Sequence, residues 1–324
     1  MILRSIDAFF FTPSAFKPPV HSLPSKLSPL ALPAAGISQH GEGPVWDARL
    51  RRLYWVNIVH GQLLWLDENA QKCRALEFPP PLGFVALTDD PGVLVAGLAS
   101  SLALLHLESG RVEALAQLES PDAPFRCNDG KCDPTGRVWA GTMSTNPDAQ
   151  PPGSLFSLKP SSPPQRVLRD VGCSNGLAWN MVRREFYFID SLAHRVDRFR
   201  WDPETGDITH RSTLASFPDD HGLPDGMCID TDGHLWVAFW DGSCVRHIHH
   251  ETGDTLATIQ LPAKRVTSCT FGGPDLATLY ITTSHEGLSP SERTAQPLAG
   301  SVFSVTPGAR GLPADYFHLR TLAS

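Results

Sequence analysis

The stretch Leu223-Pro224-Asp225-Gly226-Met227-Cys228-Ile229-Asp230 places an acid between proline and glycine, directly before an alternating apolar run. Proline and glycine favour a turn at this point, and the alternation favours a half-buried strand. Asp225 is therefore expected at a strand start, with its carboxylate facing a cavity rather than the core. Three further stretches place an oxygen-bearing side chain beside glycine before a strand-like run: Glu42-Gly43-Pro44-Val45-Trp46, Asn128-Asp129-Gly130-Lys131 and Ser174-Asn175-Gly176-Leu177-Ala178-Trp179.

The same arrangement recurs along the chain as a repeat of 40 to 50 residues. Its six units are anchored near Gly43, Gly83, Gly130, Gly176, Gly226 and Cys269. In each unit a second run follows that is rich in aromatic and β-branched residues, as in Arg52-Leu53-Tyr54-Trp55-Val56. Such residues favour pleated sheet, and a period of this length is typical of a β-propeller. We predict an all-β, six-bladed β-propeller without helices, in which Trp139 and Trp236 belong to the core between blades.

Charge and cysteine content argue against several classes of protein. The 27 Lys and Arg residues are outnumbered by 34 Asp and Glu residues, which gives a net charge of −7, and no basic run stands out. Nucleic acid is therefore not an expected partner. The seven cysteines form no C-x-x-C pair and no zinc-type spacing, which favours a reducing, cytoplasmic location.

Residues 1–37 differ in composition from the rest of the chain, because they are rich in proline, serine and alanine. We interpret them as an N-terminal extension that is disordered or loosely docked, with organelle targeting as the alternative. The apolar run from Ile6 to Phe11 is too short to span a membrane, so no membrane association is expected. Residues 38–324 are assigned to the propeller domain.

The propeller geometry brings the strand-start residues together. The innermost strands of all blades begin at the same end of the central channel, so Glu42, Asn128, Asn175 and Asp225 are expected to converge there. Two carboxylates and one or two amides would form an all-oxygen site with a charge of about −2, and a divalent cation such as Ca²⁺, Mg²⁺ or Mn²⁺ offsets that charge. The alternative is that these residues simply form turns. Their common register within the repeat favours the site.

Three other motifs suggest different chemistry. Gly172-Cys173-Ser174-Asn175-Gly176 matches the G-x-S-x-G nucleophile elbow, but that elbow requires a following helix where this sequence predicts a strand. His247, His249 and His250 lack a further ligand at zinc-like spacing and are interpreted as surface histidines. Asp230-Thr231-Asp232-Gly233 is interpreted as a hairpin turn rather than a calcium loop, because its glycine comes too early.

The motifs together resemble the regucalcin and gluconolactonase family, and the resemblance spans residues from about 40 to 318. It implies a six-bladed propeller with one divalent metal in the channel, held by Glu42, Asn175 and Asp225. It also implies that Asp225 accepts a proton and that Arg126 and Asn128 bind substrate. A further acidic contact of the family falls near Asn146, where this chain has an amide, so the preferred sugar is expected to differ. The matching segments are Gly41–Trp46, Arg126–Pro134, Ala140–Met143, Ser174–Leu177, Ile189–Ser191, Pro224–Asp230 and Thr267–Gly273.

The expected function is metal-dependent hydrolysis of a sugar lactone, glucono-1,5-lactone or a related aldonolactone, to the aldonic acid. Asp225 acts as general base and the metal polarises the lactone carbonyl. Ca²⁺ is the first choice of metal, and Zn²⁺, Mg²⁺, Mn²⁺ and Fe²⁺ also suit the site. The alternatives are a calcium-binding regulatory propeller without turnover, or a hydrolase of another lactone or a phosphoester. The sequence is compatible with a monomer or a dimer.

Overall fold

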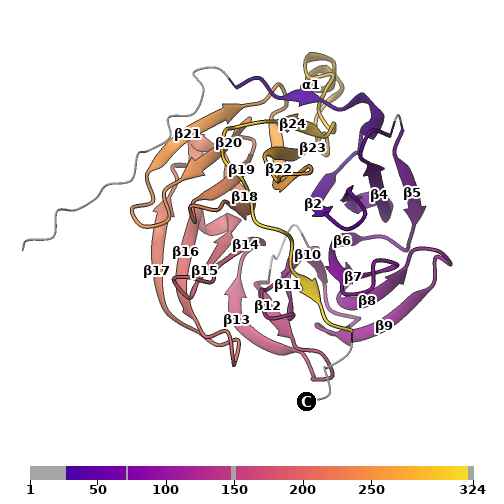
Figure 1. The fold of residues 1–324 in the computed structure, drawn as a ribbon, viewed down its shortest axis with the longest axis vertical. Coiled ribbons are helices and arrows are strands. Elements are labelled where there is room, and N and C mark those ends of the chain that lie inside the picture. The colour runs from indigo at the N-terminus through magenta and orange to yellow at the C-terminus, as the bar shows by residue number, and fades with distance from the viewer. Residues whose placement is uncertain (1–26, 71, 147–150, 320–324) are drawn as a thin grey trace, which may run out of the picture.

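The chain folds into six β-sheets arranged around a central channel, as a computed structural model shows (Figure 1). The structure describes residues 27–319, apart from residue 71 and residues 147–150. Five of the sheets have four strands, and the remaining sheet, which forms the second blade, has five. The prediction of an all-β, six-bladed propeller is confirmed.

Each blade is an antiparallel meander whose first strand lines the channel. The first blade contains β2 (Gly41–Asp47), β3 (Arg52–Asn57), β4 (Gln62–Asp67) and β5 (Arg74–Glu77), and the second contains β6 (Leu82–Thr88), β7 (Val93–Leu98), β8 (Ser101–His106) and β9 (Val112–Gln117). The third contains β10 (Phe125–Cys132), β11 (Val138–Ser144), β12 (Gly153–Leu158) and β13 (Gln165–Val171). The fourth contains β14 (Ser174–Asn180), β15 (Glu185–Asp190), β16 (Arg195–Trp201) and β17 (Ile208–Ser216). The fifth contains β18 (Leu223–Ile229), β19 (Leu235–Trp240), β20 (Cys244–Ile248) and β21 (Thr255–Gln260), and the sixth contains β22 (Arg265–Gly272), β23 (Thr278–Ser284), β24 (Phe303–Val305) and β1 (Leu30–Ala31). All six anchors of the repeat lie in these first strands.

Two segments that lie far apart in the sequence meet in the sixth blade, which closes the ring. β1 pairs antiparallel with β24, with Leu30 opposite Ser304 and Ala31 opposite Phe303. The 3₁₀ turn Pro33–Ala35 follows, and Ser38 N donates to Gly300 O at 2.8 Å. The stretch assigned to a loosely docked extension therefore includes a strand of the propeller, and the blade begins before residue 38. The rest of that extension, residues 1–26, lies outside the described residues.

The core lies between the blades, where the second strands bury their aromatic side chains. Trp139 and Trp236 are fully buried, as predicted. The Trp139 ring packs 5.6 Å from the Trp179 ring and 5.1 Å from the Phe186 ring, both of the next blade. Large aromatic rings suit this position because each sheet must fill the wedge between itself and its neighbour.

Two hairpins repeat the pattern Asp-x-x-Gly-x-x-Trp, and the aspartate organises each of them. Asp230 Oδ1 accepts from the backbone N–H groups of Asp232 and His234, at 3.0 and 2.9 Å, and Oδ2 accepts from Trp236 Nε1 at 2.9 Å. Gly233 has a φ of 83°, a conformation that glycine adopts without strain. The corresponding residues of the third blade are Asp133, Gly136 and Trp139. The interpretation of Asp230-Thr231-Asp232-Gly233 as a hairpin turn is confirmed.

One short helix, α1 (Pro290–Ala295), contradicts the expectation that the chain has no helix. Ser289 and Glu292 form a reciprocal capping box, and Pro290 occupies the first turn. The short 3₁₀ segments are η1 (Pro33–Ala35), η2 (Ile58–His60), η3 (Ser191–Ala193) and η4 (Asp219–His221). Among the described residues, no helix is long and apolar enough to cross a membrane.

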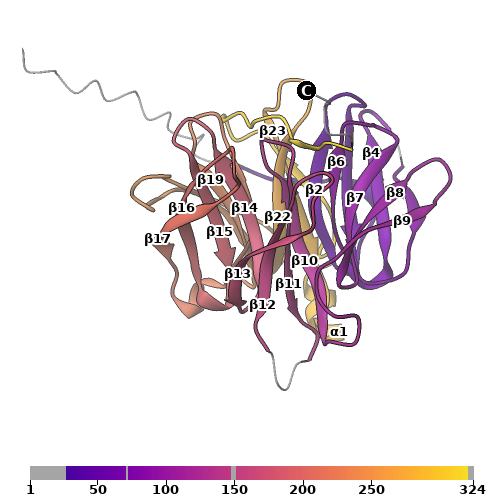
Figure 2. The same cartoon turned by 90° about the horizontal axis from the view of Figure 1, so that it is seen from below.

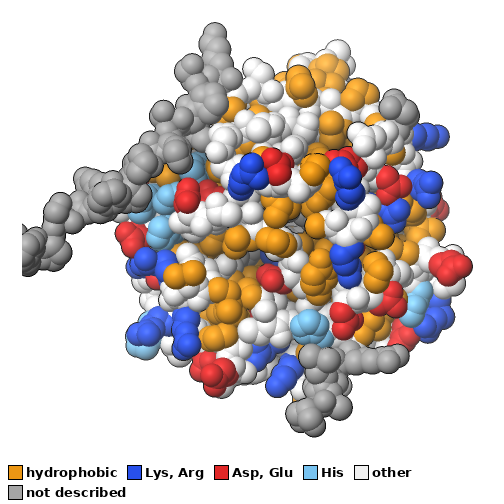
Figure 3. Space-filling model, in the orientation of Figure 1, with side chains coloured by type: hydrophobic (Ala, Val, Ile, Leu, Met, Phe, Trp, Pro, Cys, Tyr) orange, Lys and Arg blue, Asp and Glu red, His pale blue; other side chains and the backbone are white. Residues whose placement is uncertain are grey.

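The C-terminal segment, residues 306–319, crosses one face of the propeller, and we call it the strap. Its strand β25 (Tyr316–Phe317) pairs parallel with β6, and Gly311 forms a bridge with Asp230. Residues 312–315 line the same end of the channel as the last residues of the innermost strands. In Figure 2 the strap runs along the upper side of the molecule and α1 lies on the lower side. Figure 3 looks onto the strap face, where hydrophobic side chains gather around the centre.

Asp315 makes the strap sensitive to pH. Burial raises the pKa of Asp315 to about 7, and the charge of Asp133 adds to the shift while Lys131 opposes it. Because the folded state binds this proton more tightly than the unfolded chain, its stabilising contribution is complete below the ordinary pKa and is lost as the pH rises through about 7. Asp315→Asn should therefore raise the melting temperature at pH 8 and leave it unchanged at pH 4. Thermal unfolding from pH 4 to 8 tests this, with the exposed Asp122→Asn as control, and a pH-independent difference would contradict it.

Candidate active site

A cavity of about 360 Å³ lies at the end of the channel opposite the strap. All six residues singled out from the sequence line it: Glu42, Arg126, Asn128, Asn146, Asn175 and Asp225. They come from four different blades, which confirms that the strand starts converge. Their chemical roles remain predictions.

A β-bulge near the start of each innermost strand turns these side chains toward the cavity. The pairing register shifts between Glu42 and Val45 in β2, and between Pro224 and Met227 in β18. Corresponding shifts occur in β10 and β14. A bulge adds a residue on one strand, bends it and re-aims a side chain. The four strand-start motifs therefore form β-bulges, and not the simple turns that the sequence analysis gave as the alternative.

Glycine follows Asn175 and Asp225 because the innermost strands approach each other closely. A Cβ atom on Gly226 would lie 2.0 Å from Ser268 Oγ of the next blade. A Cβ atom on Gly176 would lie 2.7 Å from Met227 Cγ and 2.8 Å from the backbone oxygen of Asp225. A side chain at either position would push the blades apart and displace the neighbouring site residue.

Two buried carboxylates form the centre of the site. Glu42 and Asp225 are each only 6% exposed and lie close enough for each carboxyl group to influence the pKa of the other. Burial, followed by the charge of Asp129, raises the pKa of Glu42 to about 8. Burial, followed by repulsion from Glu42 and Asp129, raises the pKa of Asp225 well above its ordinary value. In the protein without a cation, the two acids therefore retain at least one proton near neutral pH.

A chain of hydrogen bonds joins Arg126 to the amides of the site. Arg126 Nη1 donates to Asn128 Oδ1 at 2.7 Å, and Asn128 Nδ2 donates to Asn175 Oδ1 at 3.2 Å and to Ser174 O at 2.9 Å. Asn175 Nδ2 donates to Ser191 Oγ at 2.8 Å, and Ser191 Oγ donates to Pro224 O at 2.6 Å. These bonds fix the orientation of both amides across three blades.

Asn146 lies among the cavity-lining residues, in the loop that follows β11 of the third blade. It is half-buried, and its backbone N–H donates to Ser144 Oγ at 3.0 Å. Residues 147–150, which follow it, lie outside the described residues.

Sequence reasoning missed the apolar side of the cavity. Trp240 ends β19 and lies with its ring 5.4 Å from the His40 ring. Burial, helped by the charges of Arg126 and Arg265, lowers the pKa of His40 to about 3, so this imidazole is neutral at physiological pH. His40 lies two residues before Glu42 and could have been found by strand alternation. The other apolar residues of the wall were not singled out from the sequence: Met143, Leu192 and Leu223.

The structure also tests the motifs that suggested a serine nucleophile or a histidine metal site. Ser174 is fully buried within β14 and is followed by the strand β15 rather than a helix, so it is not a nucleophile elbow. The interpretation of His247 as a surface residue was wrong: it is 8% exposed, bonds to Asp230 Oδ2 at 2.9 Å and stacks on Trp236. His249 and His250 are half-buried.

The donor set fits a hard divalent cation. Glu42 and Asp225 offer carboxylate oxygens and Asn175 offers an amide oxygen, which are the ligand types that Ca²⁺ and Mg²⁺ prefer. The two acids are held together in a buried position where ionising both is unfavourable unless a positive charge compensates them. A cation could therefore replace the proton that the pair retains.

Fold and site define a class of protein: six-bladed β-propellers with an acid-centred polar cavity at one end of the channel. The family model described as SMP-30/Gluconolactonase/LRE-like region matches residues 40–285, and the chain belongs to this family.

Known relatives share most of its length. Regucalcin of Oryctolagus cuniculus is 38% identical over 278 residues, which cover 84% of this chain and 93% of regucalcin. A Bacillus subtilis protein named "Putative sugar lactone lactonase YvrE" is 38% identical over 264 residues, 82% of this chain and 90% of that protein. The crystal structure of regucalcin from Agrobacterium tumefaciens, described as a calcium-binding protein, superimposes with a TM-score of 0.84 at 25% identity, covering 90% of this chain and 97% of that one.

Proposed function

We propose that this protein is a lactonase that hydrolyses a sugar lactone, glucono-1,5-lactone or a related aldonolactone, to the aldonic acid. The observation that carries the proposal is the buried Glu42–Asp225 pair placed beside Arg126 and Asn128 in one cavity of about 360 Å³. A site that only bound a cation would need the acids but not a guanidinium and an amide beside them. Membership of a family whose description includes gluconolactonase supports a lactone as substrate.

Glu42, Asn175 and Asp225 would hold one divalent cation, with Ca²⁺ as the first choice. When bound, the cation would supply positive charge for the lactone carbonyl oxygen as negative charge develops there. Ca²⁺ is preferred because all three donors are oxygens and because a regucalcin of similar fold is described as calcium-binding. Turnover with Ca²⁺ is to be compared with turnover in the presence of Zn²⁺, Mg²⁺, Mn²⁺ or Fe²⁺.

The reaction assigns separate tasks to the residues of the cavity. Arg126 and Asn128 bind and orient the sugar hydroxyls. Asp225, ionised when its charge is compensated, accepts a proton from the water that attacks the lactone carbonyl carbon. The bond between the carbonyl carbon and the ring oxygen then breaks, and Asp225 returns its proton to the departing ring oxygen. One lactone and one water give one hydroxy acid.

A lactone with an apolar substituent is a second candidate substrate. Trp240, Leu192 and Leu223 form part of the cavity wall, so one side of the site can accommodate a hydrocarbon group. Asn146 in place of an acid points to a change in the preferred hydroxyl pattern.

Chelated protein should not release protons from lactones above the spontaneous rate, and restoring a divalent metal should restore turnover. The measurement is proton release from D-glucono-1,5-lactone, pentonolactones and an alkyl-substituted γ-lactone, corrected for spontaneous hydrolysis, with each metal in turn and with a phosphoester for comparison. Equal turnover by chelated protein would contradict the role of the cation. Cation binding in calorimetry without turnover of any ester would overturn the lactonase in favour of a calcium-binding propeller without turnover.

A further inference from the structure

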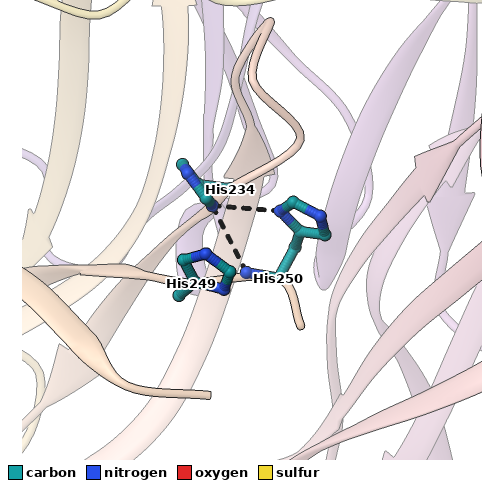
Figure 4. Close-up of side chains that lie close together, drawn as sticks. All are labelled: His234, His249 and His250. Atoms are coloured by element: carbon teal, nitrogen blue, oxygen red, sulfur yellow. Dashed lines mark hydrogen bonds between the residues drawn. The ribbon is translucent and has the colours of Figure 1, made fainter. Parts of the chain in front are cut away.

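We infer that the fifth blade carries a second metal site, independent of the channel, formed by His234, His249 and His250 and suited to a borderline divalent ion such as Zn²⁺, Ni²⁺ or Cu²⁺. The three rings gather around one point, as Figure 4 shows. One ring nitrogen of each residue lies within 4.8 Å of those of the other two. Nothing in the lactonase proposal depends on this site.

Two adjacent hairpin turns bring the three histidines together. His234 ends the turn between β18 and β19, and its backbone N–H is held by Asp230 Oδ1. His249 and His250 begin the turn after β20, and Leu235 pairs with Ile248 directly beside them. Because these positions are set by the β-ladder, the rings converge without an unusual backbone.

Individual contacts fit shared metal ligation. His234 Nδ1 lies 3.1 Å from His250 Nδ1 and also accepts the backbone N–H of His250 at 3.3 Å, a contact that a metal ion would replace. Two imidazole nitrogens bound tetrahedrally to one Zn²⁺ at about 2.1 Å are separated by roughly 3.4 Å, so these two atoms already stand at ligand spacing. His249 Nδ1 accepts the backbone N–H groups of Glu251 and Thr252, at 3.1 and 3.3 Å, and these bonds hold the ring of His249 in place.

The donor chemistry of the cluster also suits a metal, because an imidazole ring nitrogen that carries no proton offers a lone pair to a metal ion. Other groups face the cluster: Glu251 Oε1 lies 3.9 Å from His250 Nε2, and Arg183 Nη1 is 2.8 Å from that carboxylate oxygen. Three nitrogen donors favour Zn²⁺, Ni²⁺ and Cu²⁺ over Ca²⁺ and Mg²⁺, which prefer oxygen.

The cluster lies far from the candidate active site. Its first turn contacts the strap, because Thr231 N donates to Arg310 O at 2.9 Å, and the strap covers the opposite end of the channel. Histidine side chains are visible on the strap face near β21 (Figure 3). A metal bound here would cross-link the two turns of the fifth blade and stabilise the folded state by mass action.

The test is equilibrium dialysis of the untagged full chain against Zn²⁺ alone, with Ca²⁺ in excess to compete for the oxygen donors of the channel. Wild-type protein should bind one Zn²⁺ that His234→Gln and His249→Gln each bind at least about tenfold more weakly. His210→Gln, which replaces an exposed histidine of β17, should bind Zn²⁺ as the wild type does. Equal Zn²⁺ binding by the wild type and both cluster variants would overturn the site.

Electron paramagnetic resonance with Cu²⁺ provides a readout that needs no variant to fold. Cu²⁺ bound by imidazoles shows splitting from ligand nitrogen, whereas oxygen ligands alone do not produce it. The wild type should show this splitting, and a spectrum without nitrogen coupling would overturn the proposal. Lactone turnover with Ca²⁺ should be the same in His234→Gln and wild type, so the failure of either proposal leaves the other intact.

Discussion

Asp225→Asn should lower kcat for sugar-lactone hydrolysis by about 10²- to 10⁴-fold, the range expected when a general base is lost. The amide preserves the shape of the side chain but cannot accept a proton from the attacking water. Initial rates measured by proton release, with saturating Ca²⁺ and lactone, give the comparison. Asp207→Asn, which alters an exposed acid of the β16–β17 turn, is the matched control and should retain full activity.

Loss of fold would not explain that result. The pKa of Asp225 is raised by burial and by the neighbouring acids, so its ionised form disfavours the folded state at high pH when no cation is bound. Replacing it with a neutral amide should therefore raise, or at least preserve, the melting temperature of chelated protein at pH 8. Activity within a few-fold of wild type would rule out Asp225 as the base.

Trp139→Ala should lower the free energy of unfolding by about 3–5 kcal/mol, the usual cost of removing a large buried aromatic side chain. The indole is fully buried between the third and fourth blades, and its Nε1–H donates to Asp133 Oδ2 at 2.8 Å. Urea unfolding followed by circular dichroism measures the change. Trp139→Phe keeps a ring against Trp179 but removes the donor to Asp133, so its cost should be smaller.

Comparison of the two Trp139 variants separates the contribution of packing to stability from that of the hydrogen bond to Asp133. If Trp139→Ala cost less than about 1 kcal/mol, the wedge between these blades would not be the tightly packed core that the burial of this ring indicates. An equal loss in both variants would instead place most of the energy in the bond to Asp133.

The repeat made the fold and the position of the site predictable from sequence. Most of the anchor glycines recur because the innermost strands cannot approach with larger residues, and Gly226 against Ser268 shows the distance involved. The site residues beside these glycines therefore occupy equivalent positions in their blades, at one end of the channel. Convergence of Glu42, Asn175 and Asp225 therefore required no knowledge of long-range contacts.

Features that depend on contacts between distant segments could not be predicted in this way. The two residues of β1 carry no strand periodicity and are defined by backbone pairing with β24. Burial of His247 arises from its stacking on Trp236 and its bond to Asp230. The apolar wall around Trp240 is assembled from strand ends and loops. By contrast, the capping box at Ser289 was visible in the sequence and was missed.

The pairing of β1 with β24 also fixes the order in which the protein can be completed on the ribosome. Leu30 and Ala31 are synthesised long before their partners Phe303 and Ser304. Until then the sixth sheet lacks strands, and unpaired backbone groups of a sheet edge attract other chains. Joining segments so far apart costs little more entropy than a loop of half the length, because the cost grows only logarithmically. The pairing of β1 with β24 is therefore a late step with a small additional entropy cost, and it covers a sheet edge that would otherwise be free to pair with other chains.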